Sequence, residues 1–163
     1  MLSSGKIIVA GTGGQGVKSL AKILGALMVQ INYAASVIVK YDAASRGGTI
    51  YAYIVFDKNQ VENPVIDEAD ILLDLAETPR QFSAKQRLAQ KGVKPEQSAD
   101  FYDFFGLGKE KYGKPIYGNS IALGTLLAYL EADLADFDIR AALPKKLPDD
   151  NVEAVKAGYA LKK

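Results

Sequence analysis

The 163-residue sequence contains neither cysteine nor histidine. Without cysteine, the chain cannot form a disulfide, a thiolate zinc site or a cysteine-ligated iron–sulfur cluster, and it has no cysteine nucleophile. Without histidine, a Ser-His-Asp triad and a histidine general base are also excluded. Any chemistry in this chain therefore rests on Asp, Glu, Lys, Tyr, Ser, Thr or Arg side chains, or on a bound cofactor.

The sequence also lacks long hydrophobic runs and a charge of one dominant sign. No apolar run approaches the roughly 18 residues of a membrane span, and the first apolar strand follows Met1 too closely for a secretory signal. The 20 basic and 19 acidic residues give a net charge of +1, without a basic field that would attract nucleic acid. We therefore expect one cytoplasmic domain over residues 1–163 that binds neither membranes nor nucleic acid.

Glycine, by contrast, is concentrated in one short segment, Gly11-Thr12-Gly13-Gly14-Gln15-Gly16. Four glycines between an apolar strand and a helical pattern allow a tight turn and close approach to a ligand. The unpaired N–H groups at the start of the helix suit an anion, and Gln15 adds an amide that can donate and accept hydrogen bonds. The spacing matches G-x-G-x-x-G, which fits a dinucleotide, another phosphate group or only a tight turn.

Hydrophobic periodicity predicts the other elements. Strands are predicted at 6–10, 35–41, 49–56, 61–66, 71–75 and 115–117. Helices are predicted at 17–31, from a cap at Thr78 with Pro79 toward Lys91, at 121–130, and from a cap at Asn151 to the end of the chain. Helix 121–130 is apolar on nearly all sides, so we expect it to be buried. Residues 92–114 carry no pattern that predicts an element.

The alternation of strands and helices predicts a single three-layer α/β domain with a mostly parallel, mixed sheet flanked by helices. Strands 49–56 and 61–66 are separated by a short turn, so we expect them to be antiparallel neighbours. This pair makes the predicted sheet mixed.

A second candidate site follows strand 35–41, at Arg46-Gly47-Gly48. A forked guanidinium between small neighbours suits a phosphate or a carboxylate. Ligands of open α/β sheets bind beyond the carboxyl ends of the strands, where we expect this segment to lie. The structural alternative is a surface pair between Arg46 and Asp42, which would contribute little stability.

A self-contained NAD- or FAD-binding protein is the alternative function. Such a site needs an acidic residue about 20 positions past the glycines, at the end of the second strand, to bind the ribose. Asp42 lies 26 positions beyond Gly16 and close to Arg46, so it is a late candidate. The acidic residues at 67–70 are expected to form a solvated turn rather than a metal site. Asp74, within an apolar strand, is expected to be a buried or strand-end carboxylate that is hydrogen-bonded to backbone.

Several motifs, taken in order, resemble a known family. The segment 11–17, a helix and a strand, and then 41–48 with an alternating strand resemble the gamma subunit of 2-oxoacid:ferredoxin (or acceptor) oxidoreductases. This family acts on pyruvate, 2-oxoglutarate, branched-chain 2-oxoacids such as ketoisovalerate, or indolepyruvate. Segments 119–124 and 151–159 resemble its buried helix start and its C-terminal signature. The likeness covers nearly the whole chain except 92–114.

The resemblance implies a subunit that does not work alone. Enzymes of this family decarboxylate a 2-oxoacid on thiamine diphosphate, pass electrons through iron–sulfur clusters to ferredoxin and release an acyl-CoA. The chain has no cysteine for a cluster and no Gly-Asp-Gly to open a thiamine diphosphate motif. Both groups are therefore expected on partner alpha and beta subunits, with a delta or ferredoxin-like subunit as a further candidate. The resemblance implies that this chain holds no catalytic residue, metal or cofactor of its own and shares a coenzyme A site through residues 11–16 and 46–48.

Overall fold

The computed structural model describes residues 1–42, 48–94 and 98–162, which form a six-stranded sheet in the order β2-β3-β1-β4-β5-β6. The strands are β1 (Ser4–Thr12), β2 (Ala34–Asp42), β3 (Thr49–Asp57), β4 (Glu68–Asp74), β5 (Ser83–Gln90) and β6 (Asp100–Tyr102). Strands β1, β4, β5 and β6 are parallel, whereas β3 runs antiparallel to both of its neighbours, β1 and β2. The predicted single α/β domain with a mixed sheet is confirmed.

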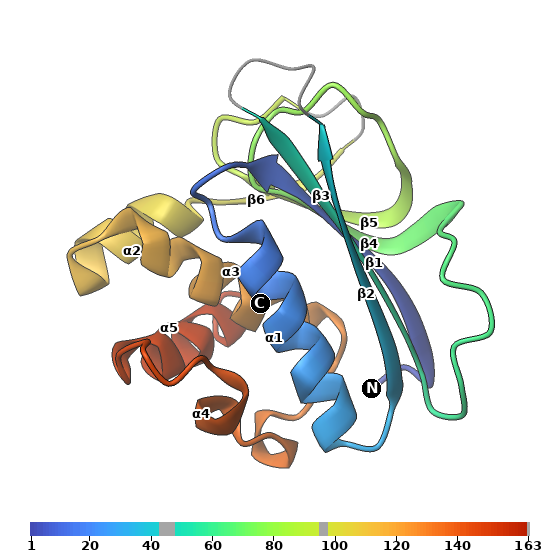
Figure 1. Ribbon diagram of the computed structural model, residues 1–163. Coiled ribbons are helices and arrows are strands. Elements are labelled where there is room, and N and C mark those ends of the chain that lie inside the picture. Colours follow the sequence, from blue (N-terminus) through green and yellow to red (C-terminus); the bar gives the residue numbers. More distant parts are fainter. Residues whose placement is uncertain (43–47, 95–97, 163) are drawn as a thin grey trace.

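The helices gather on one side of this sheet (Figure 1). They are α1 (Val17–Gln30), α2 (Phe104–Tyr112), α3 (Gly118–Tyr129), α4 (Ile139–Ala142) and α5 (Asp150–Tyr159), with short 3-10 turns η1 (Pro115–Tyr117) and η2 (Leu134–Asp136). None of the helices in the described ranges is long and apolar enough to cross a membrane.

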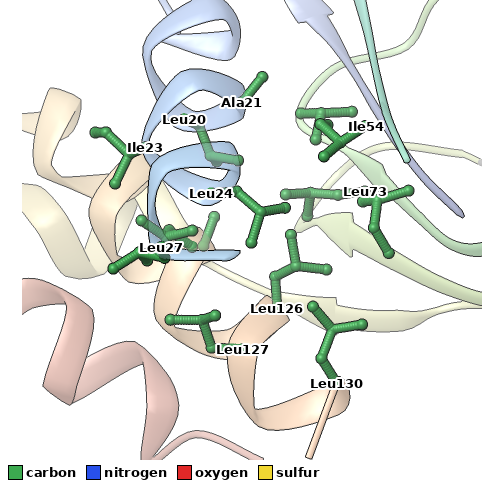
Figure 2. Packing of buried hydrophobic residues seen from close by; sticks show 14 of the residues in the cluster. Leu20, Ala21, Ile23, Leu24, Leu27, Ile54, Leu73, Leu126, Leu127 and Leu130 are labelled. Atoms are coloured by element: carbon green, nitrogen blue, oxygen red, sulfur yellow. The ribbon is translucent and has the colours of Figure 1, made fainter. Parts of the chain in front are cut away.

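The main core lies between the helices and the sheet. Side chains alternate across a strand, so Ile7 and Val9 of β1 join this core while Ile8 belongs to a smaller cluster on the other face. Figure 2 shows leucine side chains of α1 and α3 that point toward one another and toward Ile54 and Leu73 of the sheet. The smaller cluster is covered by loop segments rather than by helices: it packs against Ile66 and Phe82, among others.

Helix α3 is buried over nearly its whole surface, as its sequence predicted. It crosses α5 so closely that a Cβ on Gly124 would meet the carbonyl oxygen of Val155, and one on Gly158 would meet that of Ile121. The Thr125 hydroxyl donates to the Gly158 carbonyl at 2.8 Å across this contact. Glycine is therefore required at the crossing for the two backbones to approach.

Three predicted elements are wrong, and two of them concern the sheet. The segment predicted as a helix from Thr78 to Lys91 contains strand β5, which pairs in parallel with β4 and places Leu88 opposite Leu73. Tertiary pairing with the exposed edge of β4 here outweighs the helical preference of a short segment. The segment 61–66 forms no strand, because both edges of β3 are already paired, with β1 and with β2.

Two further segments also differ from their sequence pattern. Residues 115–117, predicted as a strand, form η1. The unassigned segment 92–114 contains β6 and α2, and the Asp103 carboxylate caps α2 by accepting from the Gly106 N–H at 3.0 Å. A side-chain cap of this kind is a local helix start signal, which the surrounding glycines and aromatic residues obscure in the sequence.

Candidate functional site

The glycine segment 11–16 forms the turn between β1 and α1. The Gln15 N–H donates to the Thr12 carbonyl at 3.3 Å, and α1 begins with Leu20 N–H donating to the Gly16 carbonyl at 2.9 Å. Gly14 and Gly16 have φ angles of 83° and 78°. L-residues pay a steric cost in this left-handed region, which glycine does not. The turn therefore depends on glycine at these two positions.

The Gln15 side chain stabilises the loop through two hydrogen bonds to the backbone. Its side-chain oxygen accepts from the Thr12 N–H at 2.8 Å, and its amide nitrogen donates to the Leu75 carbonyl at 3.1 Å. Leu75 in turn donates its N–H to the Ala10 carbonyl at 2.8 Å, just past the end of β4. Both functions of the Gln15 amide are thus used within the chain, and they fix the loop across the carboxyl ends of β1 and β4.

The structure brings Gly48 of the second predicted motif against this loop. The Gly13 N–H donates to the Gly48 carbonyl at 3.2 Å, and the antiparallel pairing of β1 with β3 places Thr12 opposite Thr49. Gly48 also has a positive φ of 64°. Arg46 and Gly47 lie outside the described residues, so the predicted recognition role of Arg46 stays a prediction.

The start of α3 reaches the same place from a distant part of the sequence. The Asn119 side chain lies against Gly16, where a Cβ would overlap its amide nitrogen. Next to it, the buried Ser120 hydroxyl donates to Asn151 Oδ1 at 2.9 Å. Asn151 was predicted to cap the last helix, but it lies inside α5 and donates its side-chain amide to the Pro148 carbonyl at 3.2 Å. The glycine loop therefore packs against Asn119 at the start of α3, and a hydrogen bond joins the neighbouring residue of α3 to α5.

The loop opens on a groove of about 710 Å³. Gly14 and Gly16 form one end, and lysines line it from three separate segments: Lys18, Lys22, Lys114 and Lys146. We call this the lysine groove. No described lining residue is acidic, and α1 carries no acidic residue in its first turn and no side-chain cap. The unpaired N–H groups and the positive end of the helix dipole therefore face a cationic groove.

Asp74 is buried but has a different partner from the one predicted. Its carboxylate pairs with the Arg87 guanidinium, Oδ2 to Nη1, at 2.8 Å rather than with backbone. Burial raises the pKa of Asp74, and Arg87 opposes that rise. Among the described residues no group of three or more acidic side chains is placed to hold a metal ion.

Comparison with known proteins identifies the family. Residues 6–161 match the family described as pyruvate ferredoxin/flavodoxin oxidoreductase. The chain belongs to this family. The predicted family is therefore confirmed. A curated protein that resembles the chain is subunit KorC of the 2-oxoglutarate synthase of Archaeoglobus fulgidus. This relative is 22% identical over 161 residues, which is 95% of the chain and 86% of the relative.

Solved structures of this oxidoreductase family share the fold. The gamma subunit of a keto/oxoacid ferredoxin oxidoreductase from Geobacter sulfurreducens superposes with a TM-score of 0.74 at 19% identity, covering 95% of this chain and 96% of the other. Subunit PORC of the Thermotoga maritima pyruvate oxidoreductase gives 0.68 at 16% identity, covering 98% and 97%.

A longer relative was solved with ligands. The 2-oxoglutarate:ferredoxin oxidoreductase from Magnetococcus marinus, with 2-oxoglutarate, coenzyme A and succinyl-CoA bound, gives a TM-score of 0.77 at 17% identity. The match covers 99% of this chain but 31% of that one. The fold of this family member thus corresponds to about a third of the longer chain.

The strand order of this family member differs from that of a dinucleotide-binding fold next to β1, where the ribose-binding acid would lie. In such folds the second strand lies next to the first, so that its terminal acid faces the glycine loop. Here β3 lies between β1 and β2. Asp42, at the end of β2, is two strand spacings from β1, or roughly 10 Å. The geometry therefore does not favour the NAD or FAD alternative.

Proposed function

We propose that this chain is the gamma subunit of a 2-oxoacid:ferredoxin (or acceptor) oxidoreductase. The enzyme would convert a 2-oxoacid and coenzyme A to an acyl-CoA and carbon dioxide, with transfer of electrons to the acceptor. Family membership over residues 6–161 supports this role, as does the full-length likeness to a 2-oxoglutarate synthase subunit. Thiamine diphosphate and the iron–sulfur clusters would be held by the alpha and beta subunits.

We further propose that the glycine loop supplies part of the coenzyme A site. One observation carries this: the loop presents the start of α1, which has no side-chain cap, to a groove without an acidic residue in its described lining. The N–H groups of the first turn of α1 have no acceptor within the helix, so they can donate to the pyrophosphate of coenzyme A. Gly14, where an added Cβ would have no atom within 4 Å, lets this phosphate approach the backbone, whereas the absence of a Cβ on Gly16 makes room for the Asn119 side chain. Arg46 and Gly47 belong to the proposal by their place beside Gly48.

In this proposal, the residues of the chain bind and orient the coenzyme rather than react with it. Gln15 and Gly48 fix the loop, and Asn119 supports it from α3. The nucleotide end of coenzyme A would be held here, and its thiol would extend to the cofactor on the partner subunits. The chain would also contribute to assembly, since the shared site is complete only with those partners.

The test is to express the chain with its alpha and beta partners, and to measure acyl-CoA formation and reduction of a viologen dye with and without it. We expect full activity only when this chain co-purifies with the partners. If it stays apart from them, and they are fully active without it, the proposed role is wrong.

A matched pair of variants tests the loop itself. Gly14→Val places a β-branched residue at a φ of 83°, whereas Gly92→Val does the same at 93° in the turn after β5. Neither position has an atom within 4 Å of an added Cβ, so both variants carry backbone strain without a clash. We expect Gly14→Val alone to raise KM for coenzyme A by roughly tenfold, equal to about 1.4 kcal/mol. Equal KM values for the two variants would contradict the loop assignment. Thermal stabilisation of the chain by NAD or FAD, lost in Gly14→Val, would support the alternative function instead.

A further inference from the structure

The lysine groove extends well beyond the glycine loop. It passes from Gly14 and Gly16 along the first two turns of α1, to η1, and to the segment 144–148 before α5. A pyrophosphate at the start of α1 would occupy only its first part. The remainder of the groove is therefore free to bind another part of the ligand.

The charged side chains of the groove indicate which kind of ligand it can bind. Lys18, Lys22, Lys114 and Lys146 are exposed, and none of them is in an ion pair with another described residue. The charged side chains that line the hollow at the other end of the strands are mainly acidic, with five carboxylates against two lysines: Asp57, Glu62, Asp67, Glu68 and Asp70 against Lys6 and Lys85. The whole chain carries a net charge of only +1, whereas the described lining of this groove has four lysines and no acidic residue. The groove therefore suits an anionic ligand.

The wall at η1 adds a flat apolar surface. The Tyr117 ring is half-buried and packs against the Tyr112 ring, with centroids 5.1 Å apart. Ile116 beside it is 44% exposed, and Leu147 and Pro148 line the same groove. Aromatic and aliphatic surface next to cationic side chains is the combination that binds a base and its phosphate.

We propose that the lysine groove holds the 3′-phosphorylated adenosine end of coenzyme A, and that its lysines distinguish coenzyme A from dephospho-coenzyme A. This inference rests on the proposed function, because it requires the pyrophosphate to lie at Gly14 and Gly16. The adenine then lies along the apolar wall near Tyr117, and the 3′-phosphate lies among the lysine ammonium groups. The pyrophosphate contacts are common to both coenzymes, so only the lysine contacts differ between them.

The test uses the assembled enzyme and two substrates, coenzyme A and dephospho-coenzyme A. Lys114→Ala combined with Lys146→Ala removes two ammonium groups from the groove. Lys145→Ala is the matched control, because Lys145 is an exposed lysine next to Lys146 that does not line the groove. We expect the double variant to raise KM for coenzyme A roughly tenfold, equal to about 1.4 kcal/mol. Its kcat and its KM for dephospho-coenzyme A should stay at the wild-type values. Lys114→Arg with Lys146→Arg should keep the preference for coenzyme A.

Each other outcome overturns the inference. If KM rises equally for both coenzymes, the lysines do not read the 3′-phosphate; if neither KM changes, they do not contact the coenzyme. If the alanine variant no longer co-purifies with the partners while the Lys145→Ala control does, the groove binds an acidic surface of a partner subunit instead. Failure of the proposed function is distinguishable, because Gly14→Val would then leave both KM values unchanged.

Discussion

Replacing Arg87 with methionine tests the buried ion pair between β4 and β5. The Arg87 and Asp74 side chains are only 5% and 10% exposed, and their Nη1–Oδ2 distance is 2.8 Å. The guanidinium also donates to the Phe82 carbonyl at 3.0 Å, while its Nε has no hydrogen-bond partner in the structure as described. Arg87→Met keeps most of the buried aliphatic volume and removes the positive charge.

The expected cost is large because the carboxylate of Asp74 stays buried without a partner. Breaking a buried pair in this way costs about 3–5 kcal/mol, a substantial part of the roughly 5–15 kcal/mol that stabilises a domain. Replacing both partners with apolar residues, as in Asp74→Leu with Arg87→Met, is often neutral or stabilising. We therefore expect the double variant to recover most of the stability that the single variant loses.

The loss should also depend on pH. Burial already raises the pKa of Asp74 above the ordinary value of an aspartate in the presence of Arg87, and removal of the guanidinium raises this pKa further. A carboxyl whose pKa is higher in the folded state stabilises the fold when protonated. That contribution is complete below the unfolded pKa and is lost as pH rises through the folded pKa. The deficit of Arg87→Met should therefore be larger at pH 8 than at pH 5.

Urea unfolding of the three proteins at both pH values measures these differences. The nine tyrosines and the absence of tryptophan make far-ultraviolet circular dichroism with tyrosine fluorescence the suitable probes. A cost below about 1 kcal/mol for Arg87→Met, within the range of an exposed ion pair, would show that the buried Asp74 carboxylate does not need Arg87. So would a cost that is the same at both pH values and is not recovered in the double variant.

Two further predictions concern the helices that support the site. Gly124→Ala should lower the free energy of unfolding by about 1–3 kcal/mol, because its Cβ meets the Val155 carbonyl oxygen and α3 and α5 must separate; an unchanged calorimetric Tm would contradict this. Asp103→Ala should cost about 1 kcal/mol at pH 7 by removing the cap of α2. The hydrogen bonds from Gln90 and Gly106 lower the pKa of Asp103, so this cost should be present above pH 3.8 and vanish as pH falls through the lowered folded pKa. Equal urea-derived costs at pH 7 and pH 3 would argue against the cap.

The candidate site could be predicted from the sequence where its signals are local. The glycine segment 11–16 indicates a strand-to-helix turn by its composition alone, and the positive φ angles of Gly14 and Gly16 confirm why glycine stands there. The contact of Gly48 with Gly13 joins two segments that the sequence marked separately. By contrast, the lysine groove leaves no signal, because its four lysines come from three segments that meet only in the folded chain.

The wrong predictions for segments 83–90 and 61–66 and for Asn151 share one physical cause. The segment 83–90 has a helical pattern, but β4 offers it an unpaired parallel edge, and β5 forms there. The segment 61–66 has a strand pattern, but no edge of β3 is free to receive it. Asn151 has the chemistry of a cap, but its side-chain oxygen Oδ1 accepts from the Ser120 hydroxyl of α3. In each case a partner distant in the sequence decides between conformations that are locally similar in energy.

The α/β class, the turn at residues 11–16, the buried helix α3 and the family can be predicted from the sequence, because each depends on local periodicity, on glycine or on an ordered set of short motifs. The tertiary structure, by contrast, sets the strand order, which places β3 between β1 and β2 and so separates Asp42 from the glycine loop. It alone also brought Asn119 against Gly16 and gathered the lysines around one groove. Pairing and packing join residues that are far apart along the chain, and their free energies depend on which surfaces remain available after the rest of the chain has folded.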